Sequence, residues 1–357
     1  MTVSSVSNSD GTLTISPTTG DVVASLSAST VSGAPGGFVN KFRNPNFSVW
    51  QRGTSNLTAT SSGAYTADGW IVIATGANVI VAEGGATGSP VSLNCLQVTG
   101  ASSNTDVTIR QRIEGSIAAP LQGQTVTVRL FFWNASGAGS ITPKMTVRHA
   151  GALDNWTSPV TDVNAVSMQT IANGSSGVVA YTFNDSGYAS NGIEISIDFG
   201  ACVSPYYFYV ADFDMRATPG VTTGQNNSPP TPELRPVPIE LAYCQRYFAS
   251  TFGNGVTPAQ NAGLSGALGA QVYGGNPGEL YTYWQFPVQM RANPTITTYS
   301  PSQNFPNWYN KTSPGSVSVS VDPDGAIGLS GVLIGSHTTP ITQGDRCYIH
   351  ATASAEL

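Results

Sequence analysis

Short runs in which apolar and polar residues alternate recur along most of the chain. In residues 125–133 the even-numbered positions hold Val, Val, Leu and Phe, whereas the odd-numbered positions hold Thr, Thr, Arg, Phe and Trp. This two-residue period places alternate side chains on opposite faces of a β-strand. Further runs predict strands at residues 70–74, 107–113, 144–149, 178–183, 193–199 and 206–215. Turn signals such as Asn191-Gly192 separate them, so residues 38–216 are predicted to form a jelly-roll β-sandwich.

Residues 217–238 interrupt this pattern with six prolines. Proline removes ladder donors and favours extended chain, which predicts a Pro-rich linker between two domains. Residues 239–357 are predicted to form a second, smaller β-sandwich with one short helix at residues 239–248, where Pro238 suits the first turn. Strands are expected at residues 282–288, 295–299, 317–321, 326–334 and 346–351, with a hairpin turn at residues 322–325.

Residues 1–37 are rich in Ser, Thr and Gly and contain no aromatic residue. Alternation predicts strands at residues 12–16 and 22–26, joined by a turn at residues 17–20. A lone hairpin is only marginally stable, and a terminus so poor in core residues is ordered most easily on a partner. We therefore expect residues 1–37 to be a docking segment, and the whole chain to be all-β.

The chain carries few charges. It has 14 Lys+Arg against 20 Asp+Glu, a net charge of −6, and only 10% charged residues, where about 25% is usual. This balance argues against a nucleic-acid partner. The absence of an apolar run of about 18 residues argues against membrane insertion, and the first residues predict no secretory signal. The four cysteines are widely spaced and are predicted to be reduced, mostly buried thiols.

A search for catalytic motifs predicts that the chain is not an enzyme. The three histidines, His149, His337 and His350, have no metal-ligand spacing, and neither a nucleophile elbow nor a P-loop occurs. A Ser–His–Asp triad stays open, because its members need not be close in sequence. Asp212 and Asp214 are spaced for one face of a strand. They fit a glycosidase pair, calcium coordination or plain solvation at a strand end.

Aromatic residues in polar surroundings are the stronger signal for binding. Flat rings stack on the C–H faces of sugars, whereas most rings in proteins fill cores or subunit interfaces. The loop-like stretch with Asn307, Trp308 and Tyr309 is the best candidate for glycan contact, together with Trp156. Both alternatives, ligand contact and core packing, remain open for each ring.

Several motifs resemble those of bacteriophage tail-fibre and virion appendage proteins. Residues 44–55 read NPNFSVWQRGTS and residues 65–70 read YTADGW. The same order continues with QRIEG at 111–115, LQGQTVTV at 121–128, YVADF at 209–213, ELAYCQRYF at 240–248 and FPVQMRANPT at 286–295. Each motif alone is weak, but together they span residues 44–295 in the expected order.

The resemblance implies a carbohydrate-binding-module-like jelly roll followed by a smaller β domain, in a homotrimer that binds host glycans or links virion parts. Related jelly rolls often carry a calcium-ligating acidic residue after the motif Phe. Ser48 stands there in this chain, which leaves Asp212 as the candidate ligand of a structural calcium; no other cofactor is expected. As structural residues, Trp50 and Trp70 are expected to be core rings. Arg52 and Asp68 are expected to form an ion pair.

These observations predict a non-enzymatic tail fibre or spike that binds host surface glycans during adsorption. The alternative is a structural head fibre, decoration protein or baseplate adaptor without glycan binding; a depolymerase is a third reading. The expected partners are further copies of the chain, other virion proteins through residues 1–37, and a host polysaccharide. The chain is expected to be made in the bacterial cytoplasm and to end up on the surface of the virion.

Overall fold

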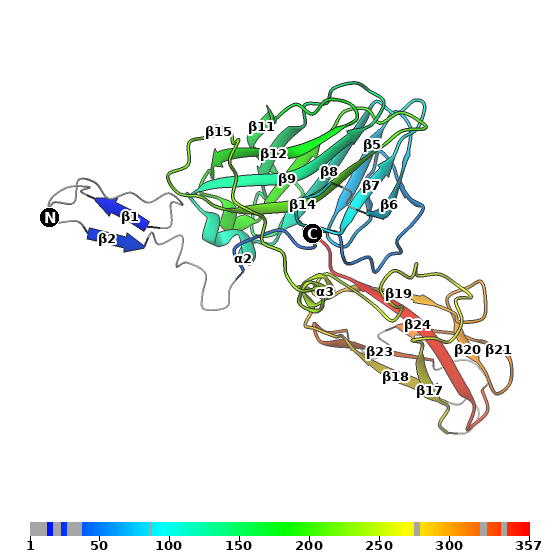
Figure 1. The fold of residues 1–357 in the computed structure, drawn as a ribbon. Coiled ribbons are helices and arrows are strands. Elements are labelled where there is room, and N and C mark those ends of the chain that lie inside the picture. The colour runs from blue at the N-terminus through cyan, green and yellow to red at the C-terminus, as the bar shows by residue number, and fades with distance from the viewer. Residues whose placement is uncertain are drawn as a thin grey trace.

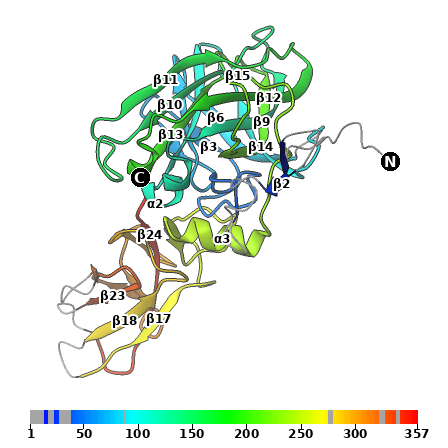
Figure 2. The ribbon, with the colours of Figure 1, turned by 90° about the vertical axis from the view of Figure 1, so that its left-hand side faces the viewer.

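The computed structural model describes residues 13–16, 23–26, 38–85, 88–274, 279–321, 327–336 and 341–357. The described chain is nearly all β, as the alternation predicts, and forms two lobes that meet beside the helix α3 (Val237–Gln245) (Figures 1 and 2). We call residues 38–236 the sandwich and residues 237–357 the C-terminal lobe. Neither short helix in the described part is long and apolar enough to cross a membrane.

The sandwich consists of two antiparallel sheets. A six-stranded sheet has the order β11-β10-β13-β8-β5-β4, and a seven-stranded sheet has the order β15-β12-β9-β14-β7-β6-β3. The strands are β3 (Leu57–Ala59), β4 (Ala64–Tyr65), β5 (Ile71–Thr75), β6 (Val79–Gly85), β7 (Asn94–Thr99), β8 (Asp106–Ile113), β9 (Thr125–Ala135), β10 (Lys144–His149), β11 (Val160–Ser167), β12 (Ser175–Asn184), β13 (Ile193–Asp198), β14 (Tyr207–Ala217) and β15 (Gly224–Gln225). The helix α2 (Gly115–Ala118) follows β8.

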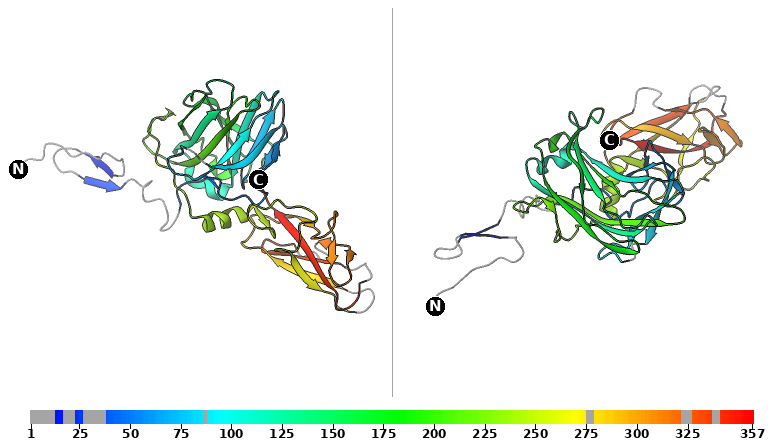
Figure 3. Two further views of the ribbon diagram at one scale, coloured as in Figure 1. Left: turned by 45° about the vertical axis from the view of Figure 1, so that its right-hand side comes forward. Right: turned by 90° about the horizontal axis from the view of Figure 1, so that it is seen from above.

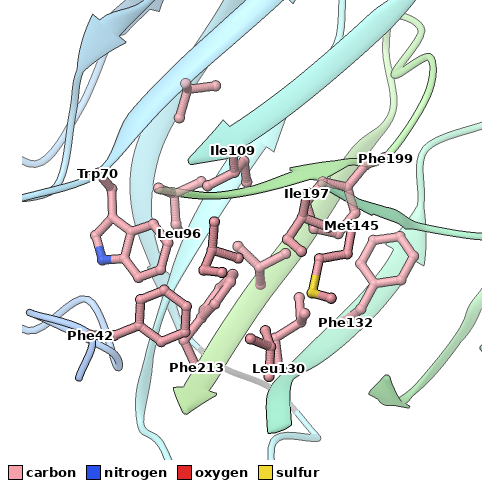
Figure 4. Packing of buried hydrophobic residues seen from close by; sticks show 14 of the residues in the cluster. Phe42, Trp70, Leu96, Ile109, Leu130, Phe132, Met145, Ile197, Phe199 and Phe213 are labelled. Carbon is pink, nitrogen blue, oxygen red and sulfur yellow. The ribbon is translucent and has the colours of Figure 1, made fainter. Parts of the chain in front are cut away.

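The core of the sandwich lies between the two sheets. The even-numbered face of β9 is completely buried there, as the alternation predicts. Figure 4 shows Trp70, Phe42 and Phe213 gathered at one end of this core, with Phe132 and Phe199 further along. The Trp70 and Phe213 ring centroids are 4.4 Å apart. Trp50 and Trp70 are 0% and 1% exposed, which confirms both as core rings.

Sequence patterning missed six strands of the sandwich: β3, β4, β6, β7, β11 and β15. The edge strand β11 pairs only with β10, through shifts in register, and its side chains are mostly exposed or half-buried. Such an edge strand has little need for an apolar face, so no alternation marks it. In the N-terminal segment, β1 (Leu13–Ser16) and β2 (Val23–Leu26) pair as predicted. The remainder of residues 1–37 lies outside the described residues.

The Pro-rich segment at 217–238 follows the surface of the sandwich. Its short strand β15 pairs with β12. Further on, Glu233 accepts a hydrogen bond from the Asn40 backbone N–H, and Arg235 donates one to the Phe42 carbonyl. Side chains thus anchor a stretch whose prolines cannot donate to a ladder.

The C-terminal lobe begins with α3, which starts slightly before the predicted helix and also ends before it. It ends early because Phe248 already belongs to a strand. Its strands are β16 (Phe248–Ser250), β17 (Leu268–Gln271), β18 (Leu280–Gln285), β19 (Thr295–Tyr299), β20 (Trp308–Asn310), β21 (Gly315–Val317), β22 (Ser320–Val321), β23 (Gly331–Ser336) and β24 (Arg346–Ser354). The long strand β24 pairs with β16, β17, β19 and β20, and a three-stranded sheet β18-β23-β22 completes the lobe. The predicted turn at 322–325 lies outside the described residues, but β22 and β23 on either side of it do pair.

Candidate functional site

The motifs of residues 44–55 and 65–70 lie where the two lobes meet. Arg52 Nη1 is 3.6 Å from Asp68 Oδ1, which confirms the expected ion pair, and Arg52 Nη2 is 3.0 Å from Glu356 Oε1 in the C-terminal lobe. The Arg52 guanidinium also stacks 3.7 Å from the centre of the Phe248 ring. One arginine therefore connects both motif segments of the sandwich to the start of β16 and to the segment after β24 in the other lobe.

Further hydrogen bonds reinforce this connection. Gln51 Nε2 donates to Asp68 Oδ1 at 2.9 Å and to the Phe248 carbonyl at 2.7 Å. The Trp50 N–H donates to Asn254 Oδ1 at 2.8 Å. Gly53 has φ +100°, and a Cβ there would lie 2.0 Å from Thr257 Oγ1, so only glycine permits the close approach of the two lobes.

Two glutamates complete the contact. Glu240 on α3 is completely buried and accepts the Asn44 N–H at 2.6 Å and Arg235 Nη1 at 3.0 Å. Glu114 of the sandwich accepts Arg246 Nη2 and the Tyr247 hydroxyl, both at 2.8 Å. We call the set that includes these contacts the interlobe joint; its members are Asn44, Trp50, Gln51, Arg52, Asp68, Glu114, Arg235, Glu240, Arg246, Tyr247, Asn254 and Glu356.

The residues predicted to contact a glycan are not brought together. Trp308 is completely buried in the core of the C-terminal lobe, and its Nε1 donates to the Gly335 carbonyl at 3.3 Å. This corrects the prediction for Trp308, because its ring packs in a core and cannot stack on a ligand. Tyr309 and Asn307 are half-buried beside it, and Asn307 donates to Ser316 Oγ at 2.9 Å. Trp156 belongs to the other lobe, where it packs against Arg112.

Asp212 occupies an irregular position in β14 with φ +53°, between the residues that pair with Phe131 and Arg129. Its carboxylate is completely buried and accepts the hydroxyls of Ser89 and Ser92. Among the described residues, no three His, Cys, Asp or Glu side chains gather as a metal site would require. A single carboxylate already bonded to two serines does not fit the six to eight oxygen ligands that calcium takes. Asp212 instead fixes the loop that contains these serines.

That loop borders an aromatic surface on the outer face of the seven-stranded sheet. Trp133 and Tyr209 lie opposite one another on β9 and β14, with ring centroids 5.9 Å apart. Tyr207 is two residues before Tyr209 on the same face, with centroids 5.1 Å apart, and is 38% exposed. Beside them on the same face, a small buried cluster of Cys95, Phe131 and Ala211 packs against Trp133 and Tyr209.

Polar side chains continue the row of rings across the sheet. Gln97 is opposite Tyr209 on one side, and Ser176 is opposite Trp133 on the other. We call Gln97, Trp133, Ser176, Tyr207 and Tyr209 the aromatic face. Since neighbouring strands are about 4.8 Å apart, the four strands that carry it span about 14 Å. Flat rings flanked by amide and hydroxyl groups match the apolar faces and hydroxyls of a sugar chain.

The chemistry of the face is that of neutral hydrogen-bonding groups. Burial and the neighbouring Tyr207 phenol raise the pKa of Tyr209 to about 12, so Tyr209 keeps its proton at neutral pH. On the side of Trp133, a Cβ at Gly88 would lie 3.6 Å from the ring. The loop fixed by Asp212 therefore forms one wall beside the rings.

The sequence contained part of this signal. Phe131 and Trp133 share the odd-numbered face of β9, and Tyr207 and Tyr209 share a face by the same alternation. What the alternation does not contain is the pairing of β9 with β14, which are more than 70 residues apart along the chain. Only that pairing places the three large rings side by side.

The described groups that resemble catalytic residues have structural partners. His149 Nδ1 lies 2.8 Å from Asp162 Oδ2, and its ring stacks on Tyr188. His350 contacts Thr251 and the Gly263 carbonyl, whereas His337 lies outside the described residues. Asp214 is paired with Arg216 rather than with Asp212. All four cysteines are free and buried, as predicted.

Fold and site together define a two-lobed β-sandwich protein with an aromatic sheet face. No family model and no curated protein matches the sequence. Similar solved structures include the enzymatically active domain of tailspike protein 4 of bacteriophage CBA120, at 11% identity and a TM-score of 0.34, with 50% of this chain and 22% of that chain covered. The C-terminal family 22 carbohydrate-binding module of Clostridium thermocellum Xyn10B matches at 14% identity and 0.31, over 43% of this chain and 88% of the module. TmCBM61, solved in complex with β-1,4-galactotriose, matches at 12% identity and a TM-score of 0.30, with 50% of this chain and 99% of that chain covered.

Proposed function

We propose that this protein is a non-enzymatic component of a bacteriophage tail fibre or spike that binds host surface glycans through the aromatic face. The observation that carries the proposal is the row of Gln97, Tyr209, Trp133 and Ser176 across four paired strands, with Tyr207 beside it. Rings of this kind offer stacking surface at low conformational cost, and their phenol and indole groups still hydrogen-bond.

The order of motifs along residues 44–295 supports the virion assignment. The low charge supports the choice of ligand, because a surface with 10% charged residues has few charges to desolvate when a neutral sugar binds. As parts of the same proposal, the chain assembles as a homotrimer and attaches to the virion through residues 1–37.

Binding to a printed array of bacterial surface polysaccharides tests the proposal. We expect the full chain to bind a subset of the polysaccharides, and Tyr207→Ala and Trp133→Ala to weaken that binding at least about tenfold, as loss of a stacking partner at a binding hot spot does. Tyr283→Ala is the matched control, because Tyr283 is 58% exposed on the C-terminal lobe. Equal binding by all variants would exclude the aromatic face as the glycan site.

A second measurement separates the proposal from its alternatives. Host cells should bind the purified protein, and periodate treatment of their glycans should abolish that binding. Intact adsorption of particles that lack the protein would favour a structural head fibre, decoration protein or baseplate adaptor. Release of reducing ends from the bound polysaccharide would identify a depolymerase. Light scattering of the purified protein at micromolar concentration should give the mass of a homotrimer.

A further inference from the structure

The outer face of the other sheet of the sandwich carries a concentration of positive charge. Glu194 on β13 lies between Arg112 on β8 and Arg148 on β10, which occupy the directly opposite positions of the neighbouring strands. Its carboxylate is 2.9 Å from Arg112 Nε, 3.0 Å from Arg148 Nη1 and 3.7 Å from Arg110 Nη1. We call Arg110, Arg112, Arg148 and Glu194 the arginine cluster.

The cluster differs in its charge balance from the other ion pairs of the molecule. Arg216, Arg235 and Arg246 each meet a carboxylate of their own. Here three guanidinium groups share one glutamate side chain, and Arg112 has a further oxygen partner at Leu357, so the arginines outnumber the acidic groups around them. Burial, together with the charges of Arg112 and Arg148, lowers the pKa of Arg110 although Glu194 acts in the opposite direction. The excess charge is therefore partly removed from water, which makes a further anion favourable there.

Donors without partners lie in the same place. Arg110 Nε and Trp156 Nε1 are buried nitrogen atoms that make no hydrogen bond. The centre of the Trp156 ring lies 4.9 Å from the Arg112 guanidinium, so the indole packs against the cluster. A buried donor left without an acceptor costs free energy, and each of these two could donate to a bound group.

The cluster is open on one side. Glu194 is 1% exposed and lies beneath the arginines, whereas the side chains of Arg110 and Arg148 are 21% and 36% exposed. Arg112 Nη1 is already used, since it donates to the Leu357 carbonyl at 2.9 Å. The free donors toward solvent therefore belong to Arg110 and Arg148.

We propose that the arginine cluster with Trp156 is a second binding site, which takes the carboxylate of an acidic saccharide such as a uronic acid. Guanidinium groups bind carboxylates through paired N–H donors, and the unpaired indole N–H of Trp156, whose ring packs on Arg112, is the donor that we assign to a hydroxyl of the same sugar. Free sulfate and phosphate share the oxyanion chemistry but lack that hydroxyl. The site lies on the sheet opposite the aromatic face, so it goes beyond the function proposed above and can fail without it.

Calorimetric titration of the full chain with trigalacturonate, at low ionic strength, tests the site. We expect binding that weakens at least about fivefold when sodium chloride is raised to about 200 mM, since salt screens exposed charges. Arg148→Gln should weaken binding about tenfold, because it removes a charge-assisted donor. It should leave the fold intact, because Glu194 keeps two other arginines. Trp156→Phe keeps the ring but not the N–H and should weaken binding about threefold.

Matched controls locate the effect. Arg346→Gln removes an exposed arginine of the C-terminal lobe and should leave the affinity unchanged. Tyr207→Ala should also leave it unchanged, which separates this site from the aromatic face. The neutral trisaccharide α-1,4-galactotriose should not compete with trigalacturonate. Undiminished binding by Arg148→Gln, or an equal loss in Arg346→Gln, would overturn the proposal. Binding of sulfate or phosphate as tight as that of trigalacturonate would overturn its assignment to a saccharide.

Discussion

The interlobe joint and the aromatic face use different parts of the chain's chemistry. The joint depends on charged side chains in a chain that has few of them. Most of these are buried and paired, as Arg52 is with Asp68 in the sandwich and with Glu356 in the C-terminal lobe. The aromatic face has no charged member, and Tyr207 is 38% exposed. Figure 3 shows the lobes from two further directions, with the C-terminus at the sandwich, where Leu357 meets Arg112.

The comparison indicates that the joint holds the two lobes together, whereas the aromatic face is available to a ligand. A buried ion pair costs much to break, because the remaining partner is left uncompensated, so changes in the joint should act on stability. Half-exposed rings contribute little to the fold, so changes in the aromatic face should act on binding. The motifs that resemble phage appendage proteins lie mainly in the joint and the adjoining core. They therefore mark mainly the scaffold of this chain; Tyr209, in the motif at 209–213, is the member that also belongs to the aromatic face.

The largest expected effect is that of Glu240→Ala in the joint. The change leaves the buried Arg235 without its carboxylate partner and the Asn44 N–H without its acceptor, so the free energy of unfolding should fall by about 3–5 kcal/mol. Chemical denaturation of the full chain measures it. Glu279→Ala removes an exposed glutamate of the C-terminal lobe and should change stability by less than about 0.5 kcal/mol. Similar values for the two variants would show that Glu240 does not stabilise the joint.

The next effect in size is that of Arg52→Ala. It removes the pair with Asp68, the pair with Glu356 and the stacking on Phe248, and should cost about 3 kcal/mol of stability. Thermal unfolding, with Arg346→Ala as the control, measures the loss. An unchanged melting temperature would refute a stabilising role for the Arg52–Asp68 pair.

The joint should also make stability depend on pH through Asp68. Burial raises the pKa of Asp68 from 3.8 to about 6, although Arg52 and the hydrogen bonds from Gln51 act in the opposite direction. Folding therefore favours the protonated form, a contribution that is fully present below about pH 3.8 and lost as the pH rises through about 6. Between pH 4 and 7 the wild-type chain should lose about 2–3 kcal/mol relative to Asp68→Asn. Denaturation of both chains at each pH measures this difference. If the free energies of unfolding of the two chains change with pH in parallel, Asp68 does not titrate in this way.

The smallest expected loss of stability tests the wall of the aromatic face. Ser89→Ala with Ser92→Ala removes both hydroxyls from Asp212 and should cost about 1–2 kcal/mol. Because the loop would no longer be fixed beside Trp133, affinity for the polysaccharide found on the array should fall as well. Asn155→Ala, in a loop elsewhere on the sandwich, is the control. If affinity is unchanged while stability falls, the loop supports the fold but not the site.

Prediction from the sequence succeeded where the information is local. Alternation in β9 and β14 was sufficient to predict both strands and the buried face of β9. The opposite charges of Arg52 and Asp68 in the two motif segments led us to expect an ion pair, which the structure contains. Prediction failed for Trp308, because the polar residues next to it in the sequence do not show whether strands from elsewhere in the chain bury its ring. It also missed Glu240 and Glu356 as members of the joint, since their partners are far away in sequence.

By itself, the sequence determined an all-β chain, its main strands, and the aromatic residues available for one face of each strand. The tertiary structure decided which of those faces meet. Alternation is a property of neighbouring residues, whereas the pairing of β9 with β14 and the closure of the lobes on Arg52 join segments far apart in the chain. Such pairing depends on the summed burial of many side chains. For that reason the exposed rings of the aromatic face, and the three arginines around Glu194, became visible only in the folded chain.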